Sequence, residues 1–185
     1  MKRTFLSLFL LLISIYAFSQ QDTNEIMQYS FPQKTENLDS VQLKDLKNRR
    51  SKNSVPLEQF GRHVYRKDSI LIYYTYLSSP PIPYGHPDLL ESLEDNQRML
   101  VGAFSSKELQ SNNPYIVDTS TIVSYNNIRF SIIEYHHHNV YYLRFRSDYD
   151  KKLRYIAGNV EFKKPDEESA KLYLNEFLQS MHFKQ

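Results

Sequence analysis

The sequence of 185 residues contains no cysteine, no tryptophan and only four glycines. Without cysteine, the chain forms no disulfide, has no site for a lipid anchor of the lipoprotein type, and offers no thiol to a catalytic or zinc site. Loops that cradle phosphate need several glycines in a fixed pattern, so the scarcity of glycine argues against such a loop. Stability must therefore come from the core, and the 15 tyrosines and 11 phenylalanines favour β-strands.

Residues 1–19 have the pattern of a cleaved signal peptide. Lys2 and Arg3 precede an apolar stretch from Phe5 to Ile15, and small residues stand before a cleavage point at Gln20. This stretch is shorter than the roughly 20 apolar residues of a membrane-spanning helix, so we expect cleavage rather than retention. We therefore predict a periplasmic or secreted protein that is not a lipoprotein and, after cleavage, not an integral membrane protein.

Loss of the signal peptide also removes the net charge of the chain. The full sequence has 23 basic and 21 acidic residues, and removal of Lys2 and Arg3 leaves 21 of each. A nucleic-acid-binding domain presents a net basic surface, so nucleic acid is not an expected partner. The remaining length suits one domain with a core large enough to fold without disulfides.

Residues 20–54 are predicted to be a polar leader ahead of a compact domain that spans residues 55–185. Residues 20–35 show no hydrophobic period and are expected to be loose. The basic run of residues 47–53 predicts a linker. Between them, a short helix is indicated by four apolar residues at helical spacing, namely Leu38, Val41, Leu43 and Leu46.

The compact domain is predicted to be α+β, with an antiparallel sheet of about six strands flanked by helices in the order β-β-α-β-β-β-β-α. Alternating apolar residues mark the strands, and tight turns such as Asn126-Asn127 join the last four into a meander. Gly158-Asn159 indicates a bulge in the last strand. The predicted strands cover residues 62–67, 69–77, 115–125, 128–135, 140–146 and 153–162, and the two helices begin at Pro87 and Pro165.

The order of elements resembles that of the PsbP-like α/β sandwich family, which includes exported bacterial members of unknown function. The likeness is closest in the last 33 residues, LRYIAGNVEFKKPDEESAKLYLNEFLQSMHFKQ, where a strand with Gly158 leads through a polar loop to a C-terminal helix. It extends over residues 55–185 as a pattern of elements, without a motif that transfers a functional residue. The resemblance implies a domain that binds other proteins or assists larger assemblies.

One strand suggests a binding surface. Over residues 140–146, alternation directs Tyr141, Leu143 and Phe145 toward the core. The other face then carries three residues of the types that dominate interface energetics: Tyr142, Arg144 and Arg146. We expect these three side chains to be exposed, unless a helix such as the one near residues 38–46 covers them.

A histidine-rich hairpin tip suggests a second kind of site. His136, His137 and His138 stand at a predicted turn, and strand alternation places Glu134, His136 and His138 on one side. Imidazole and carboxylate groups are ligands for Zn²⁺ or Cu²⁺, and the acidic residues 166–168 are expected at the same end of the sheet. The alternative interpretation is three solvated histidines on a turn, because no metal-ligand spacing such as H-E-x-x-H occurs.

The sequence shows no G-x-S-x-G elbow, no P-loop and no other spacing that assembles a catalytic site. No catalytic residue is therefore predicted. The leading hypothesis is an exported, non-catalytic binding or accessory domain with no bound cofactor, whose partner is an unidentified protein or envelope component. Two alternatives remain open, namely a metal-binding protein that uses the histidine tip and a small periplasmic hydrolase without a recognisable motif.

Overall fold

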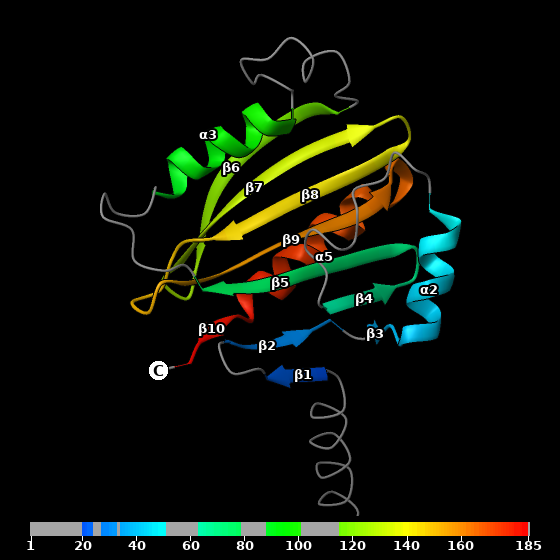
Figure 1. The fold of residues 1–185 in the computed structure, drawn as a ribbon, viewed down its shortest axis with the longest axis horizontal. Helices are drawn as coiled ribbons and strands as arrows, with labels where there is room; N and C mark the ends of the chain where they lie inside the picture. The colour runs from blue at the N-terminus through cyan, green and yellow to red at the C-terminus, as the bar shows by residue number, and fades with distance from the viewer. Residues whose placement is uncertain are drawn as a thin grey trace, which may run out of the picture.

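The computed structural model describes residues 20–23, 27–32, 34–50, 63–78, 88–100 and 115–184 (Figure 1). Seven strands form an antiparallel sheet in the order β3-β4-β5-β9-β8-β7-β6, and three more form a small sheet in the order β1-β2-β10. No helix in the described ranges is long and apolar enough to cross a bilayer. The strands are β1 (Gln20–Thr23), β2 (Met27–Phe31), β3 (Glu36–Asn37), β4 (His63–Lys67), β5 (Ile70–Ser78), β6 (Ile116–Tyr125), β7 (Ile128–His137), β8 (Val140–Ser147), β9 (Arg154–Lys163) and β10 (His182–Phe183). The helices are α2 (Ser40–Arg49), α3 (Leu89–Leu100) and α5 (Glu167–Gln179), and a short 3₁₀ turn, η2 (Lys164–Asp166), precedes α5.

The α+β class and the predicted order of elements are confirmed. From β4 to α5 the chain follows β-β-α-β-β-β-β-α, with β6 to β9 as a meander of adjacent antiparallel strands. Asn126 and Asn127 form the β6–β7 turn with φ of 51° and 61°, a conformation that asparagine tolerates better than most residues. The predicted bulge at Gly158 was wrong, because Gly158 stays in register with Tyr74 and Phe145.

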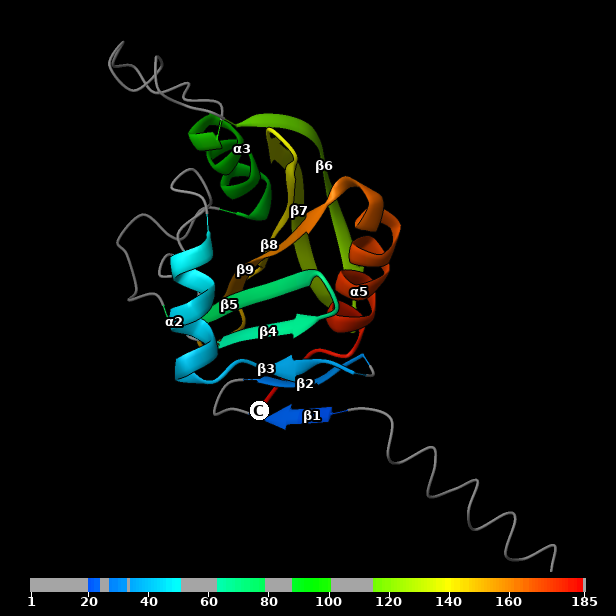
Figure 2. The same ribbon diagram turned by 90° about the vertical axis from the view of Figure 1, so that its right-hand side faces the viewer.

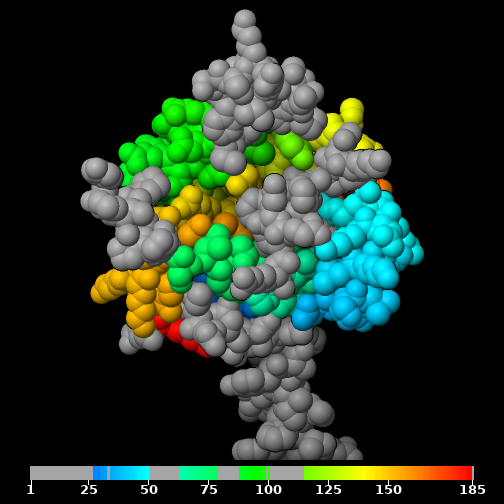
Figure 3. Space-filling view, viewed as in Figure 1, coloured from blue at the N-terminus to red at the C-terminus, as the bar shows by residue number. Residues whose placement is uncertain are grey.

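The two faces of the large sheet are covered by different helices (Figure 2). Helix α5 and the small sheet pack on one face, where the larger core contains Phe145, Val160 and Phe177. Helices α2 and α3 pack on the other face, where a second core joins Leu38, Leu93 and Tyr135. Figure 3 views this second face, with α3 in green and α2 in cyan. Because both faces are covered, strands β5 and β8 carry large buried residues on each side.

The described parts of residues 20–35, namely 20–23, 27–32 and 34–35, are not the loose leader that their polarity suggests. Strand β2 pairs with both β1 and β10, so this segment is joined to the C-terminal end of the chain. Met27, Tyr29 and Phe31 alternate along β2 and are buried in the larger core. Apolar residues do alternate over these five residues. The stretch is so short, and lies between such polar segments, that it was not recognised as a strand from the sequence.

The predicted short helix is confirmed as α2, which begins with a capping box. The side chain of N-cap Asp39 accepts hydrogen bonds from the backbone N–H groups of Val41 and Gln42, and the Gln42 side chain accepts one from Asp39 N. Arg50, assigned from the sequence to a linker, instead anchors the end of α2 to the sheet. Its Nη2 atom lies 2.5 Å from Glu161 Oε2, and burial raises the pKa of Glu161 while Arg50 opposes that rise. Residues 51–53 of the predicted linker lie outside the described ranges.

Candidate functional site

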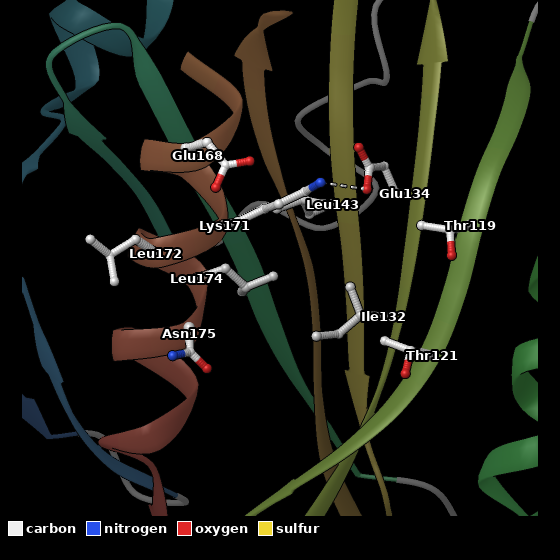
Figure 4. A pocket seen from close by; sticks show the side chains of 10 residues that line it. All are labelled: Thr119, Thr121, Ile132, Glu134, Leu143, Glu168, Lys171, Leu172, Leu174 and Asn175. Atoms are coloured by element: carbon white, nitrogen blue, oxygen red, sulfur yellow. Dashed lines mark ion pairs between the residues drawn. The ribbon is translucent and has the colours of Figure 1, made fainter. Parts of the chain in front are cut away.

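A groove of about 470 Å³ lies between α5 and strands β6 to β8 (Figure 4). We call it the α5 groove. Its floor is apolar, with Ile132 of β7, Leu143 of β8 and Leu174 of α5. Its remaining lining residues are mostly polar, with Leu172 the exception: Thr119, Thr121, Glu134, Glu168, Lys171, Leu172 and Asn175.

The groove exists because α5 does not cover the whole sheet face. The buried stripe of α5, which includes Tyr173 and Phe177, packs against β9, β2 and β8. The outer strands β6 and β7 lie beyond this stripe, so their face toward α5 is only partly filled. Thr119, Thr121 and Leu172 are exposed, with Leu172 retaining 58% of its surface, so the rims of the groove are accessible to solvent.

Two polar links hold α5 and the sheet at a fixed separation along the groove. Lys171 Nζ lies 3.1 Å from Glu134 Oε2, a link that Figure 4 shows across the groove. The hydroxyl of Tyr125, on β6, donates a hydrogen bond to the Asn175 side chain on α5. These two contacts fix α5 relative to strands β6 and β7. This favours a preformed binding site over one that forms only when the ligand binds.

Lys171 is held in its charged form by two carboxylates. Its Nζ atom lies 2.6 Å from Glu167 Oε1 in addition to its contact with Glu134. The hydrogen bond to Glu167 raises the pKa of Lys171 and outweighs the opposing effect of burial. A lysine that stays protonated is neither a nucleophile nor a general base, so Lys171 is suited to holding a charge in the groove.

Glu167 gives this arrangement a pH dependence. Hydrogen bonds from Lys164 and Lys171 lower the pKa of Glu167 from 4.5 to about 2. Because the folded-state pKa is depressed, the stabilisation is present above about pH 4.5 and is lost as the pH falls through about 2. We expect wild type to exceed Glu167→Gln in urea midpoint at pH 7, and this difference to shrink at pH 2. Glu168→Gln is the control, and an equal Glu167→Gln effect at both pH values would contradict the assignment.

The three residues predicted to form a binding surface share one sheet face, but that face is not open. Tyr142 is 0% exposed and stacks on Tyr135 at 4.9 Å between ring centroids, so its predicted exposure was wrong. Arg144 is half-buried, and burial lowers its pKa. Arg146, also half-buried, lies 4.6 Å from the centroid of the Tyr155 ring. The physical reason for the burial of Tyr142 is the second core, which contains apolar residues of α3 and against which Leu43 and Leu46 of α2 pack.

The three residues predicted to bind metal do not converge. Glu134 is buried and is engaged by Lys171, whereas His136 Nδ1 lies 2.8 Å from Asp118 Oδ2. His138 is exposed in the turn with a φ of 54°. Within the part of the chain that the structure describes, no group of three or more histidine and acidic side chains is arranged to hold a metal ion. Glu134 thus has an ionic partner in Lys171, and His136 lies within hydrogen-bonding distance of Asp118.

We expected the histidine hairpin and the acidic residues 166–168 to lie at the same end of the sheet. The contact between Glu134, near the hairpin, and Lys171, near the acidic residues, agrees with this expectation. Lys171 and the threonines of β6 were not predicted from the sequence as site residues. Glu167 and Lys171 stand four residues apart, which is the spacing of a helical ion pair and a usable signal. Thr119 and Thr121 carry no comparable signal, because their role depends on β6 lying beside α5.

The seven-stranded sheet, the helices on both faces and the C-terminal helix define a PsbP-like α/β sandwich. The chain is similar to the solution structure of cyanobacterial PsbP (CyanoP) from Synechocystis sp. PCC 6803. The TM-score is 0.55 at 10% sequence identity, over 91% of this chain and 94% of that chain. No family model matches the sequence, and no curated protein gives a significant match. The resemblance seen in the sequence is confirmed at the level of the fold.

Proposed function

We propose that this chain is an exported, non-catalytic binding or accessory domain, and that its α5 groove binds a segment of another envelope protein. The observation that carries the proposal is the composition of the groove. An apolar floor of Ile132, Leu143 and Leu174 lies beneath rims that bear hydroxyl, amide and charged groups. A concave apolar surface with a few placed polar groups is the usual form of a binding site.

The chemistry of the groove supports binding over catalysis. Its lysine is paired with two carboxylates, and one of these, Glu134, is buried beneath it. The PsbP-like fold agrees with an accessory role, and the signal-peptide pattern of residues 1–19 supports export. The equal number of acidic and basic residues after Ser19 argues against nucleic acid as the partner.

A pair of exposed leucines allows a direct test in native cells. Leu172, on α5 at the groove, and Leu90, on α3 over the opposite face of the sheet, are 58% and 53% exposed. Each is replaced in turn by the photoreactive residue p-benzoylphenylalanine, and the cells are irradiated. We expect a discrete cross-linked species from position 172, enriched in the envelope fraction, and none from position 90.

The paired positions make the experiment decisive. Equal cross-linking from both positions would show non-specific contact, and no cross-linking from position 172 would remove the groove as the binding site. The melting temperature of each variant is compared with that of wild type. Replacement of an exposed leucine is expected to change stability by less than about 0.5 kcal/mol.

A further inference from the structure

Strand β6 forms one edge of the large sheet. It follows β7 at the end of the strand order, and no other described strand pairs with its outer side. β6 is ten residues long, whereas β3 at the opposite edge has two residues and β1 in the small sheet has four. Ile116 and Ile122 on β6 are 59% and 36% exposed. An edge of this length presents a row of backbone donors and acceptors to any strand that approaches it.

β6 carries little of the protection that natural edge strands usually have. Its sequence, IVDTSTIVSY, has no proline, lysine or arginine. Its one charged residue, Asp118, is paired with His136 and lies at an irregularity between Val117 and Thr119. From Thr119 to Tyr125 the register with β7 is regular. A seven-residue stretch of the edge is therefore suitable for pairing.

The α5 groove and this edge are continuous, because Thr119 and Thr121 belong to both. In an antiparallel or parallel sheet, residues on neighbouring strands share a face at a period of two. A strand added outside β6 would place every second side chain beside these threonines, on the face toward α5. It would find Glu168 of α5 across the groove (Figure 4).

The charges of the groove favour a basic residue in the bound strand. Glu134, Glu168 and Lys171 line the groove, which leaves one negative charge in excess. Lys171 is already shared by Glu134 and Glu167. Glu168 is exposed and has no ion-pair partner among the described side chains. A lysine or arginine in the ligand would therefore meet an available carboxylate at the rim.

We propose that the partner segment binds as an extended strand added to the outer edge of β6, with apolar side chains in the α5 groove and a basic side chain toward Glu168. This inference rests on the proposed function and specifies the kind of partner. Strand addition takes its affinity from backbone hydrogen bonds and its specificity from pockets for alternate side chains. The edge of β6 supplies the backbone groups, and the α5 groove supplies the pockets.

The probe is a capped heptapeptide, Thr-Val-Thr-Lys-Thr-Val-Thr, which reads the same in both directions and so presents its lysine centrally in either strand polarity. Binding is measured by calorimetry, together with hydrogen exchange of residues 119–125. We expect slowed exchange there, and about threefold weaker binding when glutamate replaces the peptide lysine, the effect of an exposed ion pair. Glu168→Gln should abolish that preference while leaving the melting temperature nearly unchanged.

Backbone methylation of the peptide tests the strand pairing itself. One version is N-methylated at its valines and lysine, and the other at its inner threonines. A strand that pairs along one edge uses alternate N–H groups, so one version should lose about tenfold or more in affinity while the other still binds. Equal binding by both versions would overturn strand addition.

Two further outcomes separate this inference from the proposed function. Cross-linking from position 172 without binding of any peptide would refute binding of the partner as an added strand and would leave the proposed function intact. Peptide binding without cross-linking would refute the proposed function alone. Sedimentation that shows a dimer, with the amides of residues 119–125 protected before peptide is added, would assign the edge to a second copy and refute the inference.

Discussion

Replacement of Phe177 by alanine is expected to destabilise the protein by about 3–5 kcal/mol. Phe177 is 0% exposed and lies where α5, the small sheet and the large sheet meet. Its ring stacks on Phe31 of β2 at 4.8 Å, and it lies 5.3 Å from Tyr74 and 6.1 Å from Phe145, between centroids. Loss of the ring removes contacts with three elements at once and leaves a cavity that rigid aromatic neighbours cannot fill.

The measurement is urea unfolding monitored by circular dichroism. Phe177→Leu should cost clearly less than Phe177→Ala, because leucine refills much of the volume. Leu172→Ala is the matched control on the same helix, since Leu172 is 58% exposed, and it should change the free energy of unfolding by less than about 0.5 kcal/mol. A Phe177→Ala cost near that of the control would show that the aromatic cluster does not hold α5 to the sheet.

Addition of a single methyl group at Gly158 is expected to cost about 2–3 kcal/mol. A Cβ atom at this position would lie 2.5 Å from the carbonyl oxygen of Tyr73, 2.5 Å from Tyr74 Cβ and 2.7 Å from Phe145 Cζ. One of these is a backbone atom of the neighbouring strand β5, which cannot move without disturbing the pairing of β5 with β9. Glycine is required here for close approach of strands, not for a turn.

Thermal unfolding of Gly158→Ala against wild type tests this expectation. Lys163→Ala is the control, because Lys163 is exposed at the end of the same strand and should show a nearly unchanged melting temperature. An unchanged melting temperature for Gly158→Ala would mean that the sheet adjusts to the methyl group at no cost.

For Gly158, the sequence predicted an unusual position in the strand, but only the structure gave the reason for it. A glycine inside a predicted strand is unusual, and from the sequence we interpreted Gly158 as a bulge. A bulge and a close approach of another strand are two common reasons for a glycine within a strand. The choice between a bulge and a close approach depends on the side chains of β5 and β8, which are far from Gly158 in the chain. Local pattern identified the position, and only the packing of Tyr74 and Phe145 around it supplied the reason.

The predicted binding surface on strand β8 likewise depended on residues that are distant in the sequence. Alternation correctly placed Leu143 and Phe145 in the core, because the two sides of a strand separate at a period of two. It could not decide what lies over the other side. Tyr142 is buried in a second core with Leu93 and Leu100 of α3, so a residue with the character of an interface anchor is a core residue.

The sequence by itself determined the order of strands and helices in the compact domain, because alternation, turn residues and helix starts act over a few residues. It also determined that no thiol chemistry and no disulfide take part. The tertiary structure alone decided that β2 belongs to the core, that β6 is an edge, and that Thr119, Glu134 and Lys171 line one groove. These features depend on which elements become neighbours, and that is set by the burial of apolar faces from across the chain, which no local pattern encodes.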